Sequence, residues 1–285
     1  EWMISDLSIM LAEGITVPAY TTYLSRDYEY IINDCSPSIV IVSNDEQFNK
    51  IKKICQNNTS IKKIFSFEKL SEIENNSYFN IENLIQNKKT NLDIKLECKA
   101  QRSDPACIIY TSGTQGNPKG VILTHGGILS NCEGGYKLLD PILEKETRFL
   151  TWLPLSHSYE HTVQYVQILL GAKVFYAESL EKLLPNIATA KPTIMTAVPR
   201  FYQNLFSKIS FNFSKQKGLK KKLINKTIFL GVKTLNKKKL NFNEKIVNYL
   251  CEILVRRKVK NQFGGKLKAF VSGGGALDQK IGEFL

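Results

Sequence analysis

The residues best suited to chemistry lie in one run, Tyr110-Thr-Ser-Gly-Thr-Gln-Gly-Asn-Pro-Lys-Gly-Val121. Glycines let the backbone approach an anion closely, and successive N–H groups can form an anion-binding nest. Ser112 and Thr114 add hydroxyl donors, and Lys119 supplies a mobile positive charge. This combination predicts a loop that binds phosphate groups.

Two alternatives to this interpretation exist. The P-loop of nucleotide triphosphatases requires G-x-x-x-x-G-K-[ST], but Lys119 follows Pro118 and precedes Gly120, so the register fails. A glycine-rich turn with a surface lysine is the simpler alternative. The specific order of residues over the whole run favours phosphate binding.

Two further runs carry candidate residues, Leu153-Pro-Leu-Ser-His-Ser-Tyr-Glu160 and Phe270-Val-Ser-Gly-Gly-Gly-Ala-Leu277. His157 and His161 are spaced i and i+4, as in a metal pair on a helix, but no third ligand is suitably spaced, so we predict no metal site. Glu160 either orients His157 or caps the following helix. The glycines at 273–275 follow a buried strand, where missing side chains expose the backbone to a ligand; an ordinary strand-to-helix turn is the alternative.

Alternating apolar runs and helical patterns must position these residues. The patterns predict an α/β fold with parallel sheets flanked by helices. Strands are expected at 15–20, 38–43, 61–67, 106–110, 120–124, 148–152, 172–176, 193–196 and 266–271, and helices at 2–12, 25–34, 48–55, 81–86, from 126, at 219–240 and at 246–259. The strand at 38–43 is expected to be buried on both faces.

A polar stretch at 71–99 suggests a joint between two subdomains. We therefore expect a first, partial α/β subdomain at 1–100. The second, at 101–285, would contain the loop 110–121 and a basic helical segment at 215–260.

The composition is that of a globular chain, with 43% hydrophobic and 23% charged residues in 285. The longest apolar runs are far shorter than the roughly 20 residues that cross a bilayer. No signal peptide is visible, and we expect the sequence to begin inside a domain. Six cysteines without a CxxC pair suit reduced thiols, so we expect a cytoplasmic protein.

The positive charge is concentrated in one segment. The chain has a net charge of +13, and residues 215–268 hold 17 Lys and Arg against two Glu, a net charge of +15. Within it, Ile246, Val247, Leu250, Ile253 and Leu254 would form one apolar helix face. Such a segment is either a solvated basic face or a helix pair that lies on an anionic membrane. We expect no nucleic-acid partner, because interleaved aromatic residues are few.

The stretch from Tyr110 to His125 resembles the core signature of the adenylate-forming superfamily, which includes acyl-CoA synthetases, luciferases and peptide-synthetase adenylation domains. The run ending at Glu160 resembles the Leu-Pro-Leu-x-His-x-x-Glu segment of fatty-acid members, and 270–277 resembles the glycine-rich strand end behind the adenylate. With Val198-Pro-Arg-Phe-Tyr202, the likeness is greatest to long-chain fatty-acid CoA ligases. It implies the large N-terminal α/β domain of such an enzyme, incomplete at both ends.

The resemblance implies a role for each candidate residue. The β and γ phosphates of ATP would be held by Thr111, Ser112, Gly113, Thr114, Gln115, Gly116 and Lys119, where Gln115 replaces the commoner threonine. Thr114, Lys119 and His157 would be catalytic, and His157 with Glu160 would face the carboxylic acid. Gly273, Gly274, Gly275 and Ala276 would lie against the adenine or the acyl chain, although the family usually has Ala-Pro in place of Gly275-Ala276.

The activity that the resemblance implies is ATP-dependent activation of a fatty acid. The acid and ATP give acyl-adenylate and pyrophosphate, and CoA then displaces AMP, with Mg²⁺ accompanying ATP. The alternatives are a non-catalytic module that binds a nucleotide or acyl lipid, a ligase for aromatic acids, and a loader of acyl carrier protein. Because the family's Tyr-Gly-x-Thr-Glu segment, ribose-binding aspartate and C-terminal lid domain are missing, we expect this chain alone to have little activity.

Overall fold

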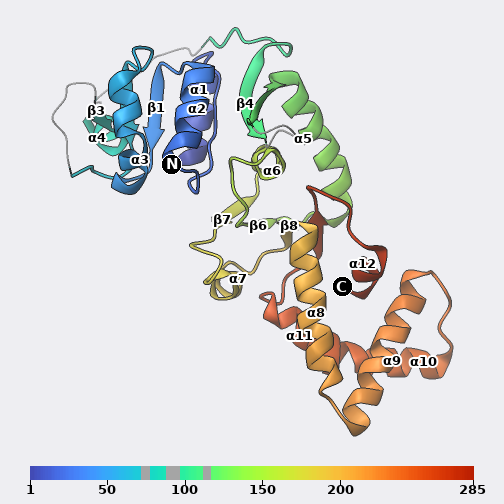
Figure 1. Cartoon of the computed structure of the whole chain (residues 1–285). Coiled ribbons are helices and arrows are strands. Elements are labelled where there is room, and N and C mark those ends of the chain that lie inside the picture. The colour runs from blue at the N-terminus through green and yellow to red at the C-terminus, as the bar shows by residue number, and fades with distance from the viewer. Residues whose placement is uncertain (72–77, 88–96, 112–116) are drawn as a thin grey trace. The chain divides into compact units, whose positions relative to one another are not determined.

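The computed structural model describes residues 1–71, 78–87, 97–111 and 117–285. The chain forms two compact units, Glu1–Ile128 and Leu129–Leu285. Each unit contains a parallel sheet accompanied by helices (Figure 1), which confirms the predicted α/β class. The joint expected near residue 100 falls within the first unit, and the subdomain division of the whole protein stays a prediction.

The first unit has a three-stranded parallel sheet in the order β1-β2-β3. Its strands are β1 (Ile39–Val42), β2 (Lys63–Ser66) and β3 (Tyr78–Asn80). Its helices are α1 (Trp2–Leu11), α2 (Ser25–Cys35), α3 (Asp45–Asn57) and α4 (Ile81–Asn87). The side chain of Asn44 caps α3 by accepting a hydrogen bond from the backbone N–H of Gln47 at 3.2 Å. Phe48 on α3 packs with Ile32 and Ile64 in the buried core of the unit.

Two expectations for the first unit are wrong. The strand at 38–43 is not buried on both faces, since Ile39 is 46% exposed and only Val42 is fully buried. The reason is that β1 lies at the edge of its sheet. No strand forms at 15–20, where Thr16 makes a single parallel bridge with Cys107. Pro18 lacks the N–H that a continued ladder would need.

A β-hairpin completes the first unit. It consists of β4 (Pro105–Thr111) and β5 (Lys119–Thr124), which pair antiparallel, so this sheet departs from the expected parallel pattern. Helix α5 (His125–Leu139) follows β5 directly.

The second unit has a four-stranded parallel sheet in the order β7-β6-β8-β9. Its strands are β6 (Arg148–Thr151), β7 (Lys173–Tyr176), β8 (Ile194–Ala197) and β9 (Ala269–Ser272). All four residues of β8 are buried, as expected of a central strand. Leu150, Ile187 and Met195 belong to the core of this unit.

Helices surround and extend this sheet (Figure 1). They are the 3₁₀-helix η1 (Asp140–Ile142), α6 (Ser158–Leu169), α7 (Leu183–Ala190), α8 (Pro199–Ser214), α9 (Gly218–Leu235), α10 (Phe242–Cys251), the π-helix η2 (Glu252–Arg256), α11 (Arg257–Gln262) and α12 (Gln279–Phe284). The two basic helices predicted at 219–240 and 246–259 are present, and the second begins earlier and continues through η2 into α11.

Candidate active site

The ends of the predicted phosphate loop lie side by side. Thr111, the last residue of β4, pairs with Lys119, the first residue of β5, across the antiparallel ladder. Both residues are exposed. The hairpin therefore presents a hydroxyl and an ammonium group at the same end of the β4–β5 ladder. The other predicted loop residues, Ser112, Gly113, Thr114, Gln115 and Gly116, lie outside the described residues.

The context of Lys119 also argues against a nucleotide triphosphatase P-loop. In that motif the lysine opens a helix, whose N–H groups bind the phosphates. Here Lys119 opens a strand, and the helix α5 begins only at His125. The position of Lys119 in the sequence and its place at the start of a strand therefore both exclude the P-loop motif.

His157 is the N-cap of α6. Its Nδ1 accepts a hydrogen bond from the backbone N–H of Tyr159 at 3.2 Å, and its side chain is exposed. The imidazole is thus anchored at one nitrogen and open to a ligand. His161, one turn later, is buried and lies 3.2 Å from the Tyr165 hydroxyl, so the two histidines do not form a pair. Among the described residues, no group of three His, Cys, Asp or Glu could hold a metal ion.

Glu160 is fully buried on α6, and its partners come from β8 and from its own helix. The Thr196 hydroxyl on β8 donates to Glu160 Oε2 at 2.9 Å, and Gln164 Nε2 approaches Oε1 at 3.4 Å. Burial raises the pKa of Glu160 to about 7, although hydrogen bonds from Thr196, Thr151 and Gln164 act in the opposite direction. Of the two roles considered for Glu160, the capping role belongs to His157. The carboxylate of Glu160 instead accepts a hydrogen bond from Thr196 on the sheet.

A buried polar cluster around Glu160 was not predicted. Gln164 and Gln167 both donate to the Thr151 hydroxyl, at 3.0 and 3.2 Å, and the Tyr176 hydroxyl donates to Gln164 Oε1 at 2.8 Å. The signal was present in the sequence, because Glu160, Gln164 and Gln167 recur at i, i+4 and i+7 and must share a helix face. These contacts fix α6 against β6 and β8, and so fix His157 at its start.

The glycine-rich end of β9 packs against the His157 run. A Cβ on Gly273 would overlap the ring of Tyr159, and the Tyr159 hydroxyl donates to the Val271 carbonyl at 2.9 Å. The Tyr202 hydroxyl donates to the same carbonyl at 3.0 Å. The second unit therefore brings together three runs that are distant in sequence, 153–160, 198–202 and 270–277.

The exposed backbone beyond this contact is available to a ligand. Gly274 has a positive φ of 74°, which favours glycine, and Gly274, Gly275 and Ala276 are all exposed. A Cβ on Gly275 would meet Pro199 at an ordinary 3.6 Å, so space does not require this glycine. Thr111 and Lys119 belong to the first unit, and the structure assembles His157, Tyr159 and Gly273 in the second.

Comparison with known proteins identifies the family. The profile of the AMP-binding enzyme family, described as "AMP-binding enzyme", matches residues 1–285. The chain belongs to the AMP-binding enzyme family. It is 30% identical to the Homo sapiens long-chain-fatty-acid CoA ligase ACSBG2 over 296 residues, and 29% identical to fatty acyl-CoA synthetase A of Dictyostelium discoideum over 292 residues.

Solved structures of adenylate-forming enzymes share the fold. The anthranilate CoA ligase AuaEII in complex with anthranoyl-AMP matches with a TM-score of 0.60 and 25% identity, over 70% of this chain and 38% of that one. A red-emitting luciferase from Phrixothrix hirtus matches 97% of this chain and 44% of its own with a TM-score of 0.65; at 15% identity it shows the fold alone. The predicted relationship to adenylate-forming enzymes is confirmed.

The match covers only part of these AMP-binding enzymes. The alignments include 100% of this chain but 44% of the human ligase and 42% of the Dictyostelium synthetase. The chain thus spans less than half the length of the curated relatives it matches.

Proposed function

We propose that the full-length protein activates a fatty acid with ATP and transfers it to CoA. The acid's carboxylate attacks the α phosphorus of ATP and releases pyrophosphate, and the CoA thiol then attacks the acyl-adenylate and releases AMP. The observation that carries this proposal is the alignment of the whole chain with proteins named as fatty-acid CoA ligases and synthetases. The family match over residues 1–285 supports it.

The phosphate loop would stabilise the leaving pyrophosphate. We assign the β and γ phosphates to Thr111, Lys119 and the run 112–116 between them. Fixed donors at a group that gains charge in the transition state lower the barrier electrostatically. The pairing of Thr111 with Lys119 supports this role, because it places both ends of the run at one end of a hairpin.

Magnesium would enter with the nucleotide. Mg²⁺ is commonly held by substrate phosphates and one or two carboxylates rather than by an all-protein cage. The Thr111 hydroxyl and the Lys119 ammonium group fit a phosphate group, and the described residues offer no cluster of three metal-ligating side chains. When bound, Mg²⁺ would supply positive charge that offsets the charge of the phosphates, and Lys119 would hold those phosphates.

The second unit would bind the acid and the adenylate. His157 presents an imidazole fixed by its capping bond, and Glu160 holds the start of α6 through the sheet. The exposed backbone of Gly274, Gly275 and Ala276 would lie against the adenine or the start of the acyl chain, with Gly273 held in place by Tyr159. The contact of Tyr159 with Gly273 joins the two runs within one unit and supports a common substrate-binding role.

The proposed partners also include an anionic membrane surface, which the basic segment 215–268 would meet. The protein would be cytoplasmic and peripheral at the inner membrane face. None of the described helices combines the length and apolar character needed to cross a bilayer. The concentration of a +15 charge in one segment supports this proposal.

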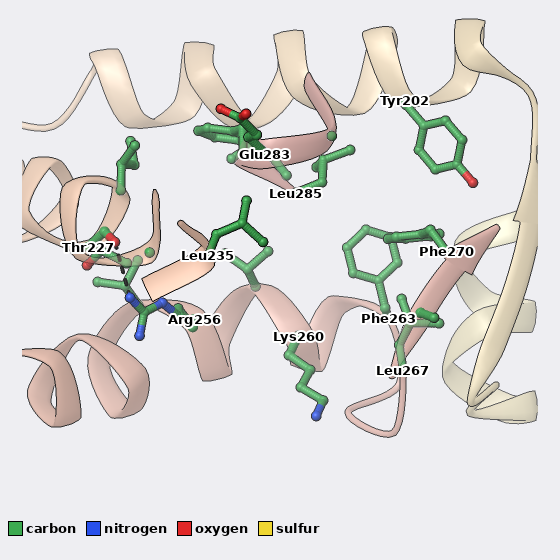
Figure 2. A pocket seen from close by; sticks show the side chains of 18 of the residues that line it. Tyr202, Thr227, Leu235, Arg256, Lys260, Phe263, Leu267, Phe270, Glu283 and Leu285 are labelled. Carbon is green, nitrogen blue, oxygen red and sulfur yellow. Dashed lines mark hydrogen bonds between the residues drawn. The ribbon is translucent and has the colours of Figure 1, made fainter. Parts of the chain in front are cut away.

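A non-catalytic acyl-lipid binding module is the second candidate. A cavity of about 710 Å³ lies among α8, α9, α11, β9 and α12 (Figure 2). Tyr202, Phe263 and Phe270 line it, with ring centroids of neighbouring pairs 5.3 to 5.5 Å apart. Its charged lining residues include both Arg256 and Lys260 and the acids Glu252 and Glu283. A largely apolar hollow of this size suits an acyl chain without requiring catalysis.

Pyrophosphate release by the full-length protein separates these candidates. We expect release that depends on ATP, Mg²⁺ and a long-chain acid, and a loss of about a hundredfold or more in Lys119→Ala and Thr114→Ala. The exposed Lys145→Ala serves as the control. An unaffected rate in both loop variants would refute the loop assignment, whereas calorimetric binding of ATP and fatty acid without pyrophosphate release would support the module.

Substrate class is tested with the same assay. A panel of palmitate, benzoate and anthranilate, each offered with CoA or with acyl carrier protein, distinguishes a fatty-acid ligase from an aromatic-acid ligase or a carrier-protein loader. We expect the highest turnover with palmitate and CoA.

A further inference from the structure

The helical pair α10–η2 carries an apolar stripe that faces outward. Phe242 is 77% exposed and Tyr249 is 67% exposed. The stripe consists of exposed apolar side chains that recur at helical spacing, Phe242, Ile246, Tyr249, Leu250, Ile253 and Leu254. Positions i, i+4, i+7, i+8, i+11 and i+12 share one side of a helix. The stripe contains four of the five residues predicted to share an apolar face, whereas the fifth, Val247, is half-buried.

The opposite side of these helices makes the structural contacts. Cys251 and Val255 are buried, and α10 lies beside α9 (Figure 1). Arg256 Nη2 donates to the Thr227 carbonyl on α9 at 3.1 Å, a bond drawn in Figure 2, and to Asn248 Oδ1 at 2.9 Å. Since the inner side is fixed by these groups, the outer stripe is not needed to hold the helices in place.

Uncompensated positive charge surrounds the stripe. The turn between α9 and α10 contains Lys237, Lys238 and Lys239, all exposed, and Phe242 follows three residues after Lys239. Lys245, Arg257 and Lys258 are exposed along the helices. The two acids of the segment are both paired, Glu244 with Lys233 at 2.7 Å and Glu252 with Arg256 at 3.4 Å.

We propose that the outer stripe of α10–η2, together with the Lys237–Lys239 turn, is the surface that docks on an anionic lipid bilayer. In this orientation the apolar side chains enter the boundary between headgroups and acyl chains, and the lysines meet the anionic headgroups. The inference rests on the proposed membrane partner, but not on catalysis by the protein.

The chemistry of the surface favours lipid over other occupants. A second copy of the chain would bring another strongly basic segment within the Debye length of about 8 Å, where repulsion is only partly screened. A nucleic acid would pair its phosphates with the lysines. It would, however, leave the aliphatic side chains of Ile246, Leu250 and Ile253 against phosphates and water. An anionic bilayer matches both the charge and the apolar stripe.

Flotation of the full-length protein with lipid vesicles tests the docking surface. We compare vesicles of phosphatidylcholine with vesicles that also contain phosphatidylglycerol, at low and at high NaCl concentration. We expect at least about tenfold stronger partitioning to the anionic vesicles, which weakens as salt rises. Equal partitioning to both vesicle types, or none, would overturn the proposal.

Matched variants locate the surface. Ile246→Ser with Tyr249→Ser should weaken partitioning at least about tenfold through lost apolar burial, and Lys238→Glu with Lys239→Glu should do so through lost attraction. Leu180→Ser, at a residue 65% exposed outside the stripe, and Lys145→Glu should have little effect. Loss in the lysine variant alone, with the stripe variant unchanged, would show that the stripe does not enter lipid and would overturn the docking geometry.

Two further measurements keep the outcomes distinct. Light scattering measures whether the free protein dimerises. A concentration-dependent dimer that the stripe variant abolishes, together with an absence of vesicle binding, would contradict the proposal. Pyrophosphate release in vesicle-free solution reports separately on the proposed ligase activity. The variants should keep that activity and the thermal unfolding midpoint, because they alter only outward-facing side chains.

Discussion

Tyr159 and Gly273 are in direct contact, such that the tyrosine ring occupies the space where any side chain on Gly273 would begin. The Tyr159 hydroxyl donates to the Val271 carbonyl at 2.9 Å, two residues before this glycine. The start of α6 and the end of β9 are therefore held together by one side chain. Since His157 caps the same helix, the contact sets the position of the imidazole relative to the glycine-rich strand end.

Replacing Gly273 should destabilise the protein. In Gly273→Ala the new methyl group overlaps the Tyr159 ring, and we expect a loss of about 1–3 kcal/mol in the free energy of unfolding. Gly275→Ala is the matched control, since its Cβ meets Pro199 at 3.6 Å and the loss should be small. Urea denaturation measures both.

The double variant identifies the cause. Tyr159→Ala removes the ring that the new methyl group meets, so Gly273→Ala should cost clearly less in that background. Equal costs in both backgrounds would show that the strain at Gly273 does not come from Tyr159.

Capping and substrate contact by His157 can be separated. His157→Asn keeps a side chain that caps helices well, so its stability should remain near that of the wild type, while His157→Ala should lose about 1 kcal/mol. If the imidazole faces the substrate, pyrophosphate release should fall in both variants. Normal release by a stable His157→Asn protein would leave His157 with the capping role alone.

The stability of the protein should depend on the ionisation of Glu160. The pKa of this carboxyl is about 7 in the folded state against 4.5 in the unfolded chain, so the folded state holds its proton longer. Between about pH 4.5 and 7 the contribution of Glu160 to the free energy of unfolding should fall as pH rises, by about 3 kcal/mol. Above that range both states are ionised, and the buried charge remains as a cost.

Glu160→Gln isolates this contribution. The amide has nearly the same shape and no charge, and other groups titrate alike in both proteins. The unfolding free energy of the wild type should therefore decrease relative to Glu160→Gln as pH rises through the window. A constant difference in unfolding free energy between the two proteins across that range would mean that folding does not raise the pKa of Glu160.

The candidate residues could be proposed from the sequence, and their roles stay a prediction, but the tertiary contacts around them could not be proposed. The runs at 153–160 and 270–277 were identified by their residue types and by their resemblance to segments of a known family. The contact of Tyr159 with Gly273 could not, since it joins positions far apart in the chain and depends on how α6 packs against the sheet. The burial of Gln164 and Gln167 had a helical spacing signal, but spacing alone does not say which side of a helix faces the core.

Secondary structure was likewise predicted where a local pattern determines it, and not where the topology of a sheet determines it. The buried strand β8 and the amphipathic helix α3 were predicted from local patterns, which burial on one or both faces imposes directly. The exposure of Ile39 depends on β1 lying at a sheet edge, and the antiparallel pairing of β4 with β5 depends on a hairpin. Both are properties of topology rather than of local pattern.

Exchange of pyrophosphate into ATP is the most direct test of the proposed activation of a fatty acid. The full-length protein with ATP, Mg²⁺, labelled pyrophosphate and palmitate should form labelled ATP without CoA, because reversal of adenylation requires only the acyl-adenylate. Lys119→Ala should reduce this exchange by about a hundredfold or more, while Lys145→Ala should not. Exchange that is independent of the fatty acid, or that survives intact in Lys119→Ala, would contradict the assignment.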